Sequence, residues 1–265
     1  MDAAQLKDRL DLANRVALEA QTLILKLYQN EDLSIDLKQD ASPVTEADKG
    51  AEMLIRNQLA EHFPDDGILG EEFGTKESQN GFRWILDPID GTKPFVHGVP
   101  LFGTLIGVEF EGRVVIGVAR FPALNEVVYA AEGQGTWWQI GNAAPRRVTV
   151  SKTQDLSRAV FCFTEPQRFK KIGRPEVLEH LMSTCCMSRG WGDCYGHILV
   201  ATGRADVMID PELSAWDAAA LVPIVREAGG SWLDWNGEES IYSGHGFSVN
   251  EGLKDEILNL LKPRS

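Results

Sequence analysis

The residues with the clearest capacity for chemistry lie in the segment Trp84–Phe95, which reads WILDPIDGTKPF. An apolar run leads into Asp87, and Asp90 follows three positions later. Pro88 disfavours a helical conformation at Asp87, so we expect a buried strand to end there and the chain to turn. Such a turn can aim both carboxylates and the Ile89 carbonyl at one point. Oxygen-only ligands of this kind favour Mg²⁺ or Mn²⁺ over zinc.

The two residues after Asp90 suit the binding of a phosphate. Gly91 permits a close approach of the backbone, and the residues from Thr92 onward can open a short helix whose free N–H groups would face an anion. Pro94 is compatible with the first turn of such a helix, where its missing N–H costs nothing. The alternative interpretation is an Asp-rich turn in which Asp90 caps the helix.

Three other acids stand at positions where they could join this group. Glu71 follows the apolar run ILG, Asp48 lies in VTEAD, and Asp217 lies in SAWDAAALVPI. Each has a plain structural explanation, because exposed Glu pairs are common and acids at helix starts complement the helix dipole. Taken separately, none of the three identifies a site.

Composition excludes several classes of function. The formal net charge is −13, and no cluster of Lys and Arg offers nucleic acid a basic face, so we expect no nucleic-acid partner. An acidic protein repels anionic substrates unless bound cations reverse the local charge. No apolar run is long enough to span a bilayer, and the first residues lack a signal-peptide pattern. The four cysteines show no CxxC spacing, which favours reduced thiols and a cytoplasmic location.

The hydrophobic pattern of the first half predicts the elements that must position these acids. A helical period predicts amphipathic helices at 5–28 and 46–62, the second capped by Thr45 and stopped by Pro64. Short apolar and alternating runs predict strands, two of which form a hairpin at Glu111-Gly112. The predicted strands are 68–70, 82–86, 102–109, 113–120, 126–131 and 135–140.

After about residue 150 strands and helices alternate, which is typical of α/β layers. The predicted strands are 159–163, 185–189, 205–209 and 231–235, and the predicted helices are 175–183, 193–202 and 216–228. We therefore expect an α+β lobe at 1–150 and an α/β lobe at 151–265. Because no flexible linker separates them, we expect one unit with a cleft between the lobes.

Four motifs together resemble the inositol monophosphatase family of metal-dependent phosphatases. They are VTEAD at 44–48, GEE at 70–72, DPIDGT at 87–92 and WDAAA at 216–220, and their order and spacing agree over nearly the whole chain. The resemblance implies a layered αβαβα sandwich of the inositol monophosphatase and fructose-1,6-bisphosphatase type. It also implies an active site between the lobes.

By this resemblance, two or three Mg²⁺ ions bind Glu71, Asp87, the carbonyl of Ile89, Asp90 and Asp217, with Mn²⁺ as a possible substitute. The physics agrees, because four carboxylates in one cleft cannot all ionise without cations. Divalent ions there would activate water and clamp the phosphate.

The resemblance further implies catalytic roles for Asp48, Glu71 and Thr92, of which Asp48 and Thr92 orient and deprotonate the attacking water. The expected reaction is a single in-line displacement at phosphorus without a phosphoenzyme. The residues that we expect to touch the substrate near its phosphate are Asp90, Gly91, Thr92 and Asp217.

Two stretches resemble the histidinol-phosphate phosphatase branch of the family. They are GVPLFGTLIG at 98–107 and WGDCYGHILVATGRADVMIDP at 191–211. This branch implies substrate contacts for Arg189, Asp193 and Asp210, because the ammonium and imidazole of histidinol phosphate can pair with carboxylates. Each residue also has a structural alternative, namely a surface salt bridge, a helix cap and a turn residue, respectively.

Two competing functions stay open at this point. Acids also accept hydrogen bonds from hydroxyl groups, so the chain could act on inositol phosphates or on sugar phosphates more broadly. One bacterial branch of the family works within transcription complexes, which makes a regulatory or scaffold protein the third hypothesis. The resemblance also implies lithium inhibition and a homodimer that acts on a small phosphate monoester in histidine biosynthesis.

Overall fold

A large mixed sheet dominates the first half of the chain in the computed structural model, which describes residues 1–30, 35–37 and 43–262. Within these residues the sheet has eight strands in the order β10-β9-β8-β7-β6-β5-β3-β4. Neighbouring strands pair antiparallel, except that β3 runs parallel to β5. The strands are β3 (Gly67–Gly70), β4 (Gly74–Lys76), β5 (Phe82–Asp90), β6 (Gly103–Phe110), β7 (Arg113–Phe121), β8 (Glu126–Ala131), β9 (Gly135–Ile140) and β10 (Arg146–Val148).

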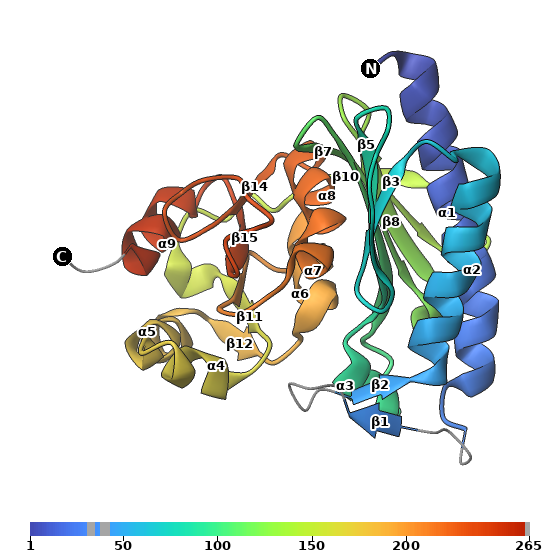
Figure 1. Cartoon of the computed structure of the whole chain (residues 1–265). Helices are drawn as coiled ribbons and strands as arrows, with labels where there is room; N and C mark the ends of the chain where they lie inside the picture. The colour runs from blue at the N-terminus through green and yellow to red at the C-terminus, as the bar shows by residue number, and fades with distance from the viewer. Residues whose placement is uncertain (31–34, 38–42, 263–265) are drawn as a thin grey trace.

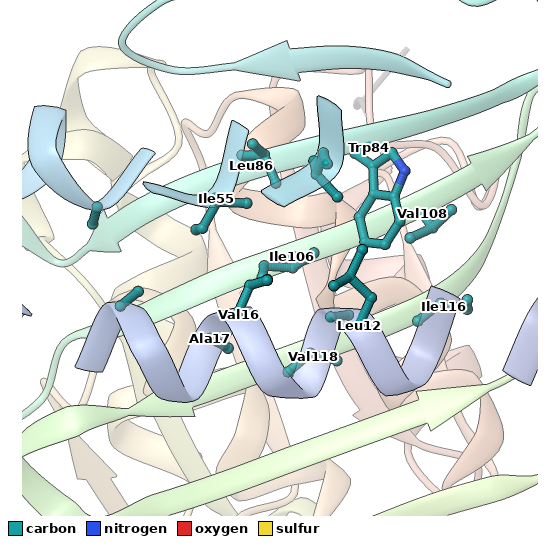
Figure 2. Packing of buried hydrophobic residues seen from close by; sticks show 14 of the residues in the cluster. Leu12, Val16, Ala17, Ile55, Trp84, Leu86, Ile106, Val108, Ile116 and Val118 are labelled. Atoms are coloured by element: carbon teal, nitrogen blue, oxygen red, sulfur yellow. The ribbon is translucent and has the colours of Figure 1, made fainter. Parts of the chain in front are cut away.

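Two long helices, α1 (Ala3–Leu27) and α2 (Glu46–His62), cover one face of this sheet (Figure 1). Apolar residues recur on one side of each helix at helical spacing, and that side packs on the strands. Figure 2 shows Val16 of α1 and Ile55 of α2 facing sheet residues such as Trp84 and Ile106. Thr45 caps α2, as the sequence predicts: its hydroxyl accepts the Ala47 N–H.

Three helices cover the opposite face of the large sheet, namely α6 (Asp193–Ala201), α7 (Ala215–Ala219) and α8 (Leu221–Glu227). Their approach is close because two strands carry glycine at the contact. A Cβ on Gly117 would lie 1.9 Å from the Ala220 carbonyl oxygen, and one on Gly107 would lie 2.6 Å from the Ala219 Cβ. Larger residues at these two positions would push the middle helices off the sheet.

A second sheet lies beyond the middle helices, and within the described chain its strand order is β12-β11-β13-β15-β14. Its far side packs with three further helices around a third apolar cluster. The strands are β11 (Val160–Phe163), β12 (Met187–Arg189), β13 (Val207–Asp210), β14 (Gly230–Leu233) and β15 (Gly246–Asn250). The helices are α4 (Pro166–Lys171), α5 (Pro175–Thr184) and α9 (Lys254–Leu261).

The layers therefore alternate as helix, sheet, helix, sheet, helix (Figure 1). This is the αβαβα sandwich that the sequence predicts. The boundary expected near residue 150 falls between β10 and β11, and the division into lobes at 1–150 and 151–265 stays a prediction. Among the described residues, no helix has both the length and the apolar character needed to cross a membrane.

Two predicted elements differ from the structure. Strand β5 runs on to Asp90 instead of ending near Asp87, because its ladder with β6 skips around Pro88 and resumes at the Asp90–Gly103 pair. The single helix expected at 216–228 is divided into α7 and α8. Pro223 has no N–H to donate to the Ala219 carbonyl, so the hydrogen-bond ladder is interrupted there.

Other elements were not predicted as such. They include β4, β10, β15, α4 and α9, and the antiparallel pair β1 (Ile35–Leu37) and β2 (Pro43–Thr45). The short helix expected after Asp90 is present as α3 (Thr92–Val96), preceded by Gly91 in the left-handed conformation at a φ of 84°.

Candidate active site

A cleft of about 870 Å³ opens beside the end of β5, and residues from both halves of the chain line it. The first half contributes residues of β5 and α3, and the second half contributes residues of α4, α6, β13 and α7. The lining includes the sequence-predicted residues Glu71, Asp87, Ile89, Asp90, Gly91, Thr92, Asp193, Asp210 and Asp217. Asp48 and Arg189 are not part of this lining.

The parallel pairing of β3 and β5 brings Glu71 beside Asp87. Gly70 is the register partner of Leu86, so the residues that follow them, Glu71 and Asp87, lie side by side, although only β5 continues in the sheet. The Glu71 N–H donates to the Leu86 carbonyl at 3.2 Å. Two acids sixteen positions apart in sequence thereby reach one corner of the cleft.

The irregularity around Pro88 lets Asp87 and Asp90 face the same space. In a regular strand, residues three apart point to opposite faces. The β5–β6 ladder skips from the Asp87–Leu105 pair to the Asp90–Gly103 pair, and the Thr104 hydroxyl satisfies the Pro88 carbonyl at 2.8 Å. The departure from regular pairing is therefore part of the site.

Asp217 reaches the same point from α7. It occupies the third position of that helix, and its carboxylate accepts the Ser214 N–H at 2.6 Å. Ligand oxygens of Asp87, Asp90 and Asp217 all lie within 4.8 Å of one another. Asp87 is buried, whereas Asp90 and Asp217 are partly exposed to the cleft.

The electrostatics of this group are unfavourable as it stands. Burial and the charges of Glu71, Asp90 and Asp217 raise the pKa of Asp87 well above its usual value. Burial and the charge of Asp193 raise the pKa of Asp90 likewise. Asp87 Oδ1 is buried without a hydrogen-bond partner. Backbone N–H groups of Cys194 and Ser214 donate to Asp90 and Asp217, but in the described part of the chain no cationic side chain is paired with this close set of oxygens. Such a set fits a hard divalent cation.

The proposed water-activating residues are placed differently from each other. The Thr92 hydroxyl donates to the Ile89 carbonyl at 3.1 Å. Asp48 is buried near the start of α2, where one oxygen accepts from the N–H and hydroxyl of Thr45 and the other, Oδ1, has no partner. Burial raises the pKa of Asp48 to about 6. In the described structure their hydrogen bonds are local, and none joins Thr92 to Asp48.

Two of the three predicted specificity residues, Asp193 and Asp210, line the cleft. Asp193 opens α6 with a positive φ of 50°, and burial together with the Asp210 charge raises its pKa to about 7. Asp210 accepts from the buried His197 at 3.2 Å. Arg189 instead lies exposed on the edge strand β12, where its guanidinium donates to the Ser188 carbonyl.

Sequence reasoning missed a basic rim on the cleft, formed by Lys93, Arg168 and Lys171. Lys93 pairs with Glu165 at 3.1 Å, and Lys171 pairs with Glu212 at 2.5 Å. The segment PQRFKK could have indicated a short basic helix, because Pro at its start and three cations within six residues are helix-compatible. Tertiary structure then decides that this helix faces the acids.

Comparisons with known proteins agree with this geometry. The model of the Inositol monophosphatase family matches residues 5–263. The "Histidinol-phosphatase" of Chlorobaculum parvum is 46% identical over 94% of this chain and 95% of its own, and that of Mycobacterium tuberculosis is 39% identical over 96% and 98%. The extragenic suppressor protein suhB from Bartonella henselae superposes with a TM-score of 0.89 at 29% identity, covering 97% of this chain and all of that one. The chain belongs to the inositol monophosphatase family.

Proposed function

We propose that the protein hydrolyses L-histidinol phosphate to L-histidinol and phosphate in a Mg²⁺-dependent reaction. The observation that carries the proposal is the convergence of Asp87, Asp90 and Asp217 within 4.8 Å at the floor of a cleft with a basic rim. The substrate follows from the relatives whose printed activity is histidinol phosphatase. The phosphate of a monoester would fit this site, because divalent cations bound by the acidic side chains would also bind its oxygens.

The residues proposed to hold two or three Mg²⁺ ions are Glu71, Asp87, the carbonyl of Ile89, Asp90 and Asp217. All of them line the cleft, all offer oxygen, and Asp87 retains a buried oxygen without a partner. When bound, Mg²⁺ would lower the pKa of a coordinated water and neutralise charge on the phosphate and the leaving oxygen. Mn²⁺ has similar ligand preferences and is the expected substitute.

The remaining tasks fall to side chains of the chain itself. We assign Asp48 as the base that receives a proton from the attacking water by way of the Thr92 hydroxyl. With a pKa of about 6, Asp48 is mostly ionised at neutral pH and can accept that proton. This role requires the Thr92 hydroxyl to turn away from the Ile89 carbonyl. Gly91 lets this turn pack closely, because a Cβ there would lie 3.0 Å from the Leu101 carbonyl oxygen.

The other end of the substrate carries an ammonium and an imidazole, and we assign their recognition to Asp193 and Asp210. Both acids line the cleft beyond the metal ligands. An ammonium between them would relieve the mutual repulsion that helps to raise the pKa of Asp193. Arg189 is not among the residues that line the cleft, and its substrate contact stays a prediction.

A substrate panel tests the proposal. Purified protein with Mg²⁺ should hydrolyse L-histidinol phosphate with a higher kcat/KM than myo-inositol 1-phosphate or fructose 1,6-bisphosphate. Asp193→Asn should lower kcat/KM for L-histidinol phosphate more than it lowers kcat/KM for myo-inositol 1-phosphate, whose polyol part carries no positive charge. Absence of phosphate release from L-histidinol phosphate would disprove the substrate assignment. Preference for inositol or sugar phosphate would favour the alternative function.

We also propose a cytoplasmic homodimer, which rests on family resemblance and on reduced cysteines. The four cysteines, Cys162, Cys185, Cys186 and Cys194, are all free thiols. Sedimentation equilibrium of the purified protein tests the oligomeric state directly. A monomer at assay concentrations would overturn the dimer, and fractionation of cells would test the location.

A further inference from the structure

The turn after β3 carries Glu71, and it is hydrogen-bonded to Glu52, a buried acid of α2. The Glu52 side chain is fully buried at 0% exposure. One of its oxygens accepts the N–H of Glu72 at 2.8 Å, and the other accepts the N–H of Phe73 at 3.2 Å. Arg56 donates to the same carboxylate at 2.7 Å. The two backbone bonds start at the residue directly after Glu71.

The surrounding residues are shaped around this carboxylate. A Cβ on Gly70 would lie 2.0 Å from Glu52 Oε1, so any larger residue at the end of β3 would displace the acid. Arg56 also donates to the Gly74 carbonyl at the far end of the turn. Glu52 and Arg56 therefore tie residues 71–74 to α2 at both ends.

Glu71 is thus fixed from two sides through its backbone. On one side its own N–H donates to the Leu86 carbonyl of β5, and on the other side the next N–H donates to Glu52. We infer that Glu52 is a positioning residue that holds Glu71 at the metal-binding corner of the cleft. This inference rests on the proposed function, in which Glu71 is a metal ligand and takes part in catalysis.

A purely structural role is the competing explanation, and the chain offers a matched comparison. Asp66 is another buried acid of the first half, and it accepts from Arg9, Asn80 and Trp84. Its partners are side chains remote from the cleft lining, whereas two partners of Glu52 are the backbone groups that follow Glu71. Loss of either acid should destabilise the fold. Metal binding should change when Glu52 is lost and should not change when Asp66 is lost.

The test compares Glu52→Gln with Asp66→Asn. Binding of Mn²⁺ to the substrate-free protein is measured by electron paramagnetic resonance, and the Mg²⁺ concentration for half-maximal activity is measured alongside thermal unfolding. Because supporting residues of a metal site typically control affinity by about 10- to 100-fold, Glu52→Gln should weaken Mn²⁺ binding by roughly that factor. Its kcat at saturating Mg²⁺ should recover in part. Asp66→Asn should lose stability and bind Mn²⁺ like the unmodified protein.

Three outcomes decide the inference. Mn²⁺ binding by Glu52→Gln that equals that of the unmodified protein would overturn it, as would an equal loss of binding in Asp66→Asn. If Glu52→Gln does not fold, Arg56→Lys is the second variant, because it removes the guanidinium contact with Gly74 at a partly exposed residue. It should weaken Mn²⁺ binding by a smaller factor. Unchanged Mn²⁺ binding in Arg56→Lys would also overturn the inference. Failure of the unmodified protein to hydrolyse histidinol phosphate while it still binds Mn²⁺ would instead refute the proposed substrate.

Discussion

Two buried acidic sites stand at opposite ends of the same short parallel strand pair, β3 and β5, and they differ in their partners. Asp66 precedes β3 and is met by the Arg9 guanidinium through two hydrogen bonds of 2.8 Å, and by Asn80 and the Trp84 indole. Beyond the other end lie Asp87 and Asp90, for which like charges are the main neighbours.

The acids at the two ends of the β3–β5 pair differ in their partners, and this difference separates a stabilising site from a functional one. At the Asp66 end, the buried charge has a cationic partner and every carboxylate oxygen has a donor, so the site locks α1 onto the sheet. At the other end, Asp90 accepts the Cys194 N–H, but among the described residues no cation is paired with these two acids and one oxygen of Asp87 has no donor. These acids are kept although their mutual repulsion costs stability. Strongly perturbed acids in a cleft are the usual mark of a functional site.

Asp90→Asn should separate activity from stability most sharply. Loss of this proposed ligand should reduce kcat/KM by about 10²- to 10³-fold, because weaker metal binding removes positive charge that would stabilise the transition state. The metal-free variant should nevertheless melt higher, by about 2 to 4 °C for each kcal/mol of relieved repulsion. Phosphate release and thermal melts with a chelator measure both. A lower melting temperature without metal would contradict the contrast.

Asp66→Asn should show the opposite behaviour. Breaking a buried, hydrogen-bonded ion pair typically costs about 3 to 5 kcal/mol, so the free energy of unfolding should fall by roughly the lower figure. Among folded molecules, kcat/KM should stay close to that of the unmodified protein, because Asp66 does not line the cleft. Urea unfolding and steady-state kinetics on the same sample make the comparison. A selective loss of kcat would count against it.

The pH dependence of stability without metal should reveal the unneutralised acids. Burial raises the pKa of Asp48 to about 6 and that of Asp193 to about 7, so the folded protein holds protons that the unfolded chain has already released. The free energy of unfolding should therefore fall as pH rises from about 4 to about 7, with Asp48 alone contributing on the order of 3 kcal/mol. Urea unfolding at stepped pH with a chelator measures this slope. Mg²⁺ should flatten it, and a stability that rises over this range would be inconsistent with the raised pKa values.

Arg168→Ala should have the smallest effect. This rim cation donates to the Glu212 carbonyl, and its charge offsets part of the rise that burial causes in the pKa of Asp193 and Asp217. Partly exposed ion pairs contribute about 0 to 1 kcal/mol, so stability should barely change and KM should rise only a few-fold. The difference in KM between Arg168→Ala and the unmodified protein should become smaller as the salt concentration rises, which steady-state kinetics can measure. A collapse of kcat would place Arg168 in the catalytic machinery instead.

Local signals explain which parts of the structure could be predicted. Helix α2 begins after Thr45 and ends at His62 as expected, because its cap, its apolar face and the following proline all lie in the sequence. The path of β5 past Asp87 and the division between α7 and α8 were not predicted, because both depend on neighbours that accommodate a proline. The exposed position of Arg189 depends on β12 being an edge strand, which no local pattern records.

Motif order and periodicity were enough to predict the family, the layered architecture and the set of acids that could bind metal. Which of these acids lie close together depends on contacts between elements that are distant in sequence. The parallel pairing of β3 with β5, the irregular ladder at Pro88 and the seat of α7 on Gly107 bring Glu71, Asp87 and Asp217 to one place. The same packing separates them from Asp66, which is equally acidic in sequence but finds an arginine in space. The partners that surround a buried carboxylate, and not its residue type, set whether it stabilises the fold or is available for chemistry.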